Sequence, residues 1–212
     1  MKTRNLLPII FIALIACNPS QKETGAAENE QWIQLFNGKD LSDWTIKICK
    51  HPLGENYNNT FRVRDGKLVT SYDEYETFNG EYGHIFYKVP FSHYRLRVEY
   101  RIIGEQVPGG ADWAFKNSGV MFHARPPEEM LVEQEFPVCL EAQFLGGSGE
   151  GERPTGNLCT PGTHVVIGGE LVTRHCTNST SPTFHGDQWV RFELVVYGDS
   201  IIHHIVAVSY TH

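Results

Sequence analysis

N-S-G-V-M-F-H-A-R-P-P at 117–127 and P-V-C-L-E-A-Q-F at 137–144 are the stretches that decide the fold of this chain. In both, apolar residues alternate with polar ones, which is the period of a β-strand with one buried face. The predicted outer face of the two strands carries Met121, His123, Arg125, Cys139, Glu141 and Gln143. Most of these groups can titrate, donate or accept hydrogen bonds. The pattern therefore predicts two strands whose outer face is either a floor for a polar ligand or a charged face in contact with solvent.

The rest of the chain also reads as strands and turns. Residues 94–103 alternate most clearly, and Asp65-Gly66 and Gly168-Gly169 are turn dipeptides within predicted hairpins at 61–69 and 164–176. No helical period persists for three turns. The sequence therefore predicts an all-β chain, folded as a β-sandwich of two antiparallel sheets.

Composition and charge exclude some functions. The chain has 212 residues, of which 20 are glycine, and its formal net charge is -7. It has no basic stripe that could neutralise phosphates, so we expect no nucleic-acid partner. The charge is compatible with a neutral polar ligand.

The N-terminus has the features of an export signal. Lys2 and Arg4 precede an apolar run at 6–15 that is too short to span a bilayer. L-I-A-C at 14–17 resembles a bacterial lipobox, which implies cleavage before Cys17 and its lipidation. An ordinary secretory signal with a coincidental cysteine is the alternative.

With residues 1–17 as signal and lipobox, the polar residues 18–30 are expected to form a flexible tether. The lipobox reading places the protein in the bacterial cell envelope. There it would be lipid-anchored to the membrane, on the outer membrane or facing the periplasm.

Four cysteines remain after the lipobox: Cys49, Cys139, Cys159 and Cys176. If all four pair, three connectivities are open. Cys159 and Cys176 flank a glycine-containing segment, which makes a disulfide between them the first expectation. A zinc site is less expected because no C-x₂-C spacing occurs.

Three regions together resemble one family. They are L-F-N-G-K-D-L-S-D-W at 35–44, N-S-G-V-M-F-H-A-R at 117–125, and L-E-A-Q-F at 140–144 with T-G-N-L-C-T-P-G-T at 155–163. These motifs are similar to those of the 3-keto-disaccharide hydrolase domain family, which is frequent in bacterial lipoproteins. The resemblance covers about residues 31–206. It implies a concanavalin A-like jelly roll whose concave sheet holds a sugar. The last residues, 207–212, are expected to be a non-native or truncated tail.

The resemblance also implies a chemistry. A sugar 3-dehydrogenase, the metabolic partner acting upstream, oxidises the C3 hydroxyl to a ketone and thereby makes the C2 proton acidic. A base removes that proton, the enolate expels the group at C1, and water adds back. Such a site needs a base, donors for the enolate oxygen and an acid for the leaving group.

Residue roles follow from the resemblance and the strand pattern. His123 is the expected base, with Glu141 as its orienting group or as the acid. Asn117 and Gln143 suit hydroxyl or enolate binding, and His175 could close over the sugar. Arg101 and Glu99 are either substrate contacts or, more in keeping with surface residues, a salt-bridged pair at the rim.

Trp113 could stack on a sugar ring, although most tryptophans in sandwiches lie in the core. No cofactor is required by the pattern. His123, Glu141 and His175 are the residues that could hold a divalent metal.

Two other functions are also compatible with the sequence. A non-catalytic carbohydrate-binding module would bind sugar without turnover. A direct glycoside hydrolase would use Glu99 and Glu141 as its two carboxylates and would act on unoxidised sugars.

Overall fold

The computed structural model describes residues 31–208, and every strand lies in the compact unit that begins at Gln34. This part of the chain contains thirteen strands and three short 3-10 turns. The predicted signal segment 1–17, the predicted tether 18–30 and residues 209–212 lie outside the described residues. Among the residues described, no helix is long and apolar enough to cross a membrane.

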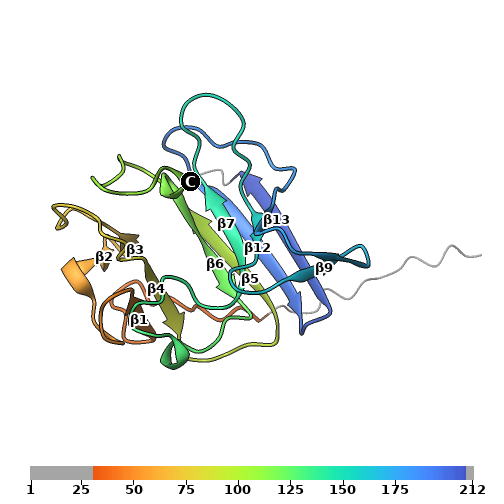
Figure 1. The fold of residues 1–212 in the computed structure, drawn as a ribbon, viewed down its shortest axis with the longest axis horizontal. Coiled ribbons are helices and arrows are strands. Elements are labelled where there is room, and N and C mark those ends of the chain that lie inside the picture. The colour runs from red at the N-terminus through yellow and green to blue at the C-terminus, as the bar shows by residue number, and fades with distance from the viewer. Residues whose placement is uncertain (1–30, 209–212) are drawn as a thin grey trace, which may run out of the picture. The chain divides into compact units, whose positions relative to one another are not determined.

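Two antiparallel sheets pack face to face and form the sandwich (Figure 1). The four-stranded sheet has the order β11-β8-β7-β6, and the three-stranded sheet has the order β13-β12-β5. The strands of the first are β6 (Asn117–Phe122), β7 (Leu140–Leu145), β8 (Asn157–Cys159) and β11 (Cys176–Thr177). The strands of the second are β5 (His93–Tyr100), β12 (Val190–Tyr197) and β13 (Ile201–Val208). The predicted β-sandwich is therefore confirmed.

The core between the sheets follows from the period of two along each strand. Ala142 and Phe144 on β7 point inward, while Phe192 and Leu194 on β12 face them, and all four are buried. The ring of Phe144 stacks on Tyr100 of β5, with centroids 4.1 Å apart. Because side chains alternate, Glu141 and Gln143 must lie on the opposite, outer face of the four-stranded sheet.

Two smaller pairs of strands precede the sandwich in the chain: β1 (Trp44–Ile48) with β4 (Gly83–Tyr87), and β2 (Phe61–Arg64) with β3 (Lys67–Thr70). Ile46, Ile48 and Phe61 form a second buried cluster there. The three 3-10 turns are η1 (Tyr57–Asn59), η2 (Asp112–Ala114) and η3 (Pro127–Glu129).

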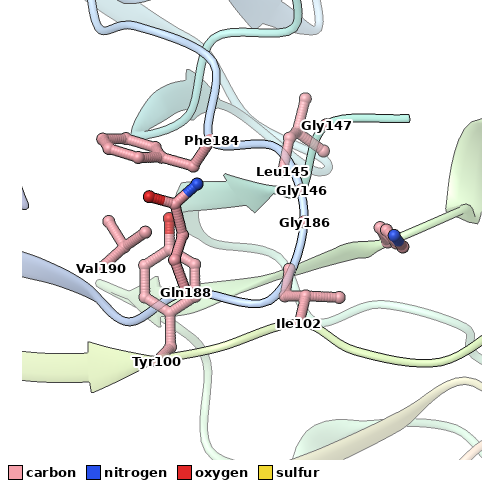
Figure 2. A pocket seen from close by; sticks show the side chains of 10 residues that line it. Tyr100, Ile102, Leu145, Gly146, Gly147, Phe184, Gly186, Gln188 and Val190 are labelled. Carbon is pink, nitrogen blue, oxygen red and sulfur yellow. The ribbon is translucent and has the colours of Figure 1, made fainter. Parts of the chain in front are cut away.

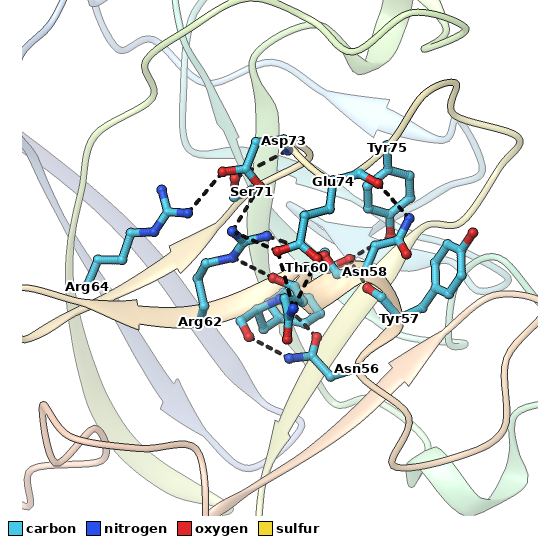
Figure 3. Close-up of polar contacts among 12 residues, drawn as sticks. Asn56, Tyr57, Asn58, Thr60, Arg62, Arg64, Ser71, Asp73, Glu74 and Tyr75 are labelled. Carbon is cyan, nitrogen blue, oxygen red and sulfur yellow. Dashed lines mark hydrogen bonds and ion pairs between the residues drawn. The ribbon is translucent and has the colours of Figure 1, made fainter.

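Polar contacts tie the loop after β3 to the hairpin (Figure 3). Arg62 and Arg64 contact the two oxygens of Asp73 at 2.8 and 2.9 Å. The Thr60 hydroxyl lies 2.6 Å from the Tyr75 hydroxyl and is buried. The Arg64–Asp73 pair is exposed, and exposed ion pairs stabilise little by themselves, so the buried hydrogen bond between the Thr60 and Tyr75 hydroxyls contributes more to holding this loop.

The turn dipeptides were predicted correctly. Asp65-Gly66 connects β2 to β3, and Gly168-Gly169 connects β9 (Val165–Ile167) to β10 (Glu170–Val172). Both residues of each dipeptide have a positive φ, which is the conformation that two-residue hairpin turns require.

The predicted C-terminal tail, 207–212, begins inside the last strand, and its non-native origin stays a prediction. Ala207 and Val208 were assigned to a non-native tail, but they belong to β13 and pair with Arg191 and Val190. The ladder of β12 is long enough to continue the antiparallel pairing through both residues.

Candidate active site

Glu141 lies in the middle of the outer face of the four-stranded sheet. Its neighbours across the strands are Met121 on β6 and Cys159 on β8. Cys159 in turn pairs with Cys176 of β11, and the two form a disulfide, as the sequence predicts. Side chains opposite each other in an antiparallel ladder share a face, so Glu141 is flanked by a thioether on one side and a disulfide on the other.

This apolar setting changes the acidity of Glu141. Burial raises its pKa from 4.5 to about 7, because the ionised form loses water that no protein donor replaces. The carboxyl accepts no hydrogen bond from the described residues, although the side chain is only partly covered. A carboxyl with a pKa near neutrality and some access to solvent has the properties of a general base.

Gly119 makes the room that the carboxyl occupies. The oxygen Oε1 of Glu141 lies 2.5 Å from the position that a Cβ on residue 119 would take. Gly119 is the partner of Gln143 in the ladder. The carboxyl of Glu141 therefore leans along the strand toward the row that contains Gln143.

Gln143 is held by its amide oxygen, and its amide nitrogen has no hydrogen-bond partner among the described residues. The side chain of Asn157 donates to Gln143 Oε1 at 3.0 Å, and Asn157 is fixed by a 2.9 Å hydrogen bond from the Ser179 backbone to its Oδ1. Asn157 is buried, so this arrangement is rigid. The Nε2 group of Gln143 makes no hydrogen bond to the described residues and remains a donor for an oxygen lying beside Glu141.

His123 lies elsewhere than the strand pattern predicts. The pattern extends the first strand to residue 125, but β6 ends at Phe122, and His123 has a φ of 49°. A left-handed residue cannot continue an extended ladder, so the strict alternation stops there. His123 is exposed, with its ring 5.6 Å from that of Phe122. It is therefore at the end of the strand that carries Met121, and it is not in the row that carries Glu141.

Glu99 and Arg101 lie on the far side of the sandwich. Glu99 is on the outer face of β5, where it accepts two hydrogen bonds from Arg191, and Arg101 contacts Asp187 at 3.2 Å. Glu99 and Glu141 thus point away from each other on the outer faces of opposite sheets. Glycosidase carboxylates lie within about 10 Å of each other, and packed sheets alone are about 10 Å apart. Glu99 and Glu141 therefore cannot act together as the two carboxylates of a glycoside hydrolase.

The predicted metal ligands are not gathered into a site. His175 precedes β11 and is exposed, and its backbone oxygen accepts a hydrogen bond from the Thr160 backbone at 2.8 Å. Within residues 31–208, no group of three or more His, Cys, Asp or Glu is arranged to hold a metal ion. The set of His123, Glu141 and His175 does not fit a metal in this arrangement.

Trp113 belongs to the surface. It lies in η2, 54% of it is exposed, and its backbone oxygen accepts a 3.2 Å hydrogen bond from Asn117. Its ring stacks on Tyr82 and lies 6.2 Å from Phe136. Tyr82 and Phe136 could not be predicted from the sequence, because only the fold brings these distant segments together.

A small cavity opens at one end of the sandwich (Figure 2). It is lined by Tyr100 and Val190 from one sheet, Leu145 from the other, and Gln188 and Phe184 from the segment before β12. None of the predicted site residues lines it.

Comparisons with known proteins identify one match. The model of a family described as "3-keto-alpha-glucoside-1,2-lyase-like domain" matches residues 31–207. No curated protein matches the chain, and no solved structure does. The match covers both sheets up to residue 207 of β13, and it includes Glu141, Gln143 and Asn157.

Proposed function

The chain belongs to the 3-keto-alpha-glucoside-1,2-lyase-like domain family, and on that premise we propose that it cleaves 3-keto-glycosides by removing the C2 proton. The single observation that carries the proposal is Glu141, a carboxyl with a pKa of about 7. It lies on the sheet face next to an amide donor held by Asn157. A C2 proton is acidic only when C3 is a ketone, so the substrate is the oxidised sugar. A sugar 3-dehydrogenase is the reaction partner that must supply it.

Glu141 is the proton acceptor in this proposal. Its carboxylate takes the C2 proton, and the electron pair of the C–H bond moves to the C3 oxygen as an enolate. Gln143 Nε2 donates a hydrogen bond to that oxygen. A donor that is already oriented stabilises developing charge without further rearrangement.

Loss of the leaving group completes the cleavage. The enolate electrons form a double bond between C1 and C2, and the C1–O bond breaks with its electron pair on the leaving oxygen. A proton for that oxygen comes from His123, the exposed histidine at the end of β6, or from the newly protonated Glu141. Addition of water to the double bond then gives net hydrolysis.

A carbohydrate-binding module on the same fold is the second candidate. It needs polar groups for hydroxyls, which Asn117 and Gln143 supply, but it gains nothing from an isolated carboxyl with a raised pKa. Burying such a group without a hydrogen bond costs stability. This loss of stability is expected at a catalytic group, whereas a binding surface would gain nothing from it.

The experiment is a comparison of matched substrates. Residues 18–212 are incubated with a 3-keto-disaccharide and with the same disaccharide unoxidised. We expect release of the leaving sugar from the 3-keto form only. Equal turnover of both would refute the elimination chemistry, and binding without turnover of either would leave the binding module as the function.

A further inference from the structure

We infer that the exposed ring of Trp113 is the platform on which the leaving group of the substrate rests. The inference deepens the proposed function and depends on it. It means that preferred substrates carry a ring, either a second sugar or an aryl group, on the C1 oxygen. Three observations on the geometry around Trp113 carry it.

The first observation is that Trp113 has a supported face and a free face. Its ring stacks on Tyr82 with centroids 5.4 Å apart and planes 24° apart. Phe136 packs against both rings, with centroids 5.0 Å from Tyr82 and 6.2 Å from Trp113. More than half of Trp113 nevertheless remains exposed. A rigid, backed aromatic surface is suited to the apolar C–H face of a pyranose or to another flat ring.

The second observation is that Trp113 is attached to the polar row of the sheet. Asn117 shares its face of β6 with Gly119 and Met121, because side chains alternate along the strand. The amide of Asn117 donates to the Trp113 backbone oxygen at 3.2 Å. Asn117 therefore positions the platform at one end of the face that carries Glu141 and Gln143.

The third observation concerns the contact between the rings of Trp113 and Phe136. Trp113 precedes β6 and Phe136 precedes β7, and these antiparallel strands begin at opposite ends of their ladder. Their rings are still in contact. The two segments must therefore converge beside the β6–β7 pair. Trp113, Tyr82 and Phe136 are not among the described residues that form the core between the two sheets.

The spacing along β7 indicates which ring of the substrate lies on Trp113. Asn117 is opposite Leu145, four residues along β7 from Glu141, which is a distance of about 13 Å at about 3.3 Å per residue. This is the distance along the sheet between the carboxyl and the residue that holds the Trp113 segment, and it leaves room for a second ring beside the oxidised one. The oxidised ring must lie over Glu141, where its C2 proton is removed. The ring on Trp113 is consequently the one that leaves.

The test compares two substrates that share the oxidised ring, a 3-keto-disaccharide and a methyl 3-keto-glycoside. We expect Trp113→Ala to lower kcat/KM for the disaccharide by about 3- to 10-fold, mainly through KM, since one stacking contact is worth roughly this factor. The methyl glycoside should be cleaved at the wild-type rate. Trp113→Phe, which retains a flat ring, should recover most of the loss.

Tyr197→Ala is the matched control, because Tyr197 is also 54% exposed but lies at the end of β12 in the other sheet. Tyr197→Ala should leave kcat/KM unchanged for both substrates. An equal loss of kcat/KM on both substrates in Trp113→Ala, or no loss on either, would overturn the inference. Turnover by the wild-type protein would still support the proposed function in that case. If the wild-type protein cleaves neither 3-keto substrate, both proposals fail together.

Discussion

Replacing Glu141 with glutamine is expected to lower kcat for 3-keto-disaccharide cleavage by on the order of 10²- to 10⁴-fold, the usual contribution of a general base. Glutamine has nearly the same shape and cannot accept the C2 proton, so sugar binding should be retained. The measurement is steady-state release of the leaving sugar, with binding measured separately by titration calorimetry. Because burial raises the pKa of Glu141 to about 7, the wild-type rate should increase with pH through that value. The increase reflects the growing fraction of carboxylate.

His123→Ala is the comparison that separates the two candidate bases. If Glu141 is the base and His123 the acid, His123→Ala should still exchange the C2 proton with solvent. The rate at which His123→Ala cleaves the substrate should depend strongly on how good the leaving group is. Loss of C2 exchange in His123→Ala, together with its retention in Glu141→Gln, would reverse the two roles.

Glu141→Gln should also make the protein more stable at alkaline pH. In the folded protein Glu141 keeps its proton up to about pH 7, whereas an unperturbed carboxyl ionises near pH 4.5. Between these values the folded state binds more protons than the unfolded state, so this group's contribution to stability falls as the pH rises. The two pKa values set a ceiling of about 3 kcal/mol on the gain in free energy of unfolding at pH 8. At pH 4 the gain should vanish.

Urea unfolding of both proteins at pH 4 and pH 8 measures this difference. Glu150→Gln, an exposed glutamate in the loop after β7, is the matched control and should leave stability unchanged at both values. Equal stability of wild type and Glu141→Gln at pH 8 would show that the carboxyl does not lie in a poorly hydrated position. A loss of activity combined with a gain in stability is the pattern that a strained catalytic group predicts.

Local sequence was sufficient to predict the parts of the fold that depend on neighbouring residues. The alternation from Tyr94 to Tyr100 predicted β5, and Asp65-Gly66 and Gly168-Gly169 predicted two hairpins. Glu141 and Gln143 were correctly assigned to one polar face, because an i, i+2 relation in a strand needs no knowledge of the other sheet.

The features that depend on distant contacts could not be predicted in this way. The positive φ of His123 ends β6 one residue before the predicted base, and nothing in F-H-A-R marks that reversal. The raised pKa of Glu141 comes from burial by the assembled fold. Glu99 seemed a possible partner for Glu141 only because sequence pattern does not tell which sheet a strand joins.

The central claim, C2 proton removal, is tested most directly by following an isotope. A 3-keto-disaccharide carrying deuterium at C2 is cleaved in ordinary water, and the label is measured in the released oxidised sugar and in the remaining substrate. The account predicts that the label is lost to solvent during cleavage, and that cleavage is slower than with the unlabelled substrate wherever proton removal limits the rate. Complete cleavage with the deuterium still at C2 would contradict it.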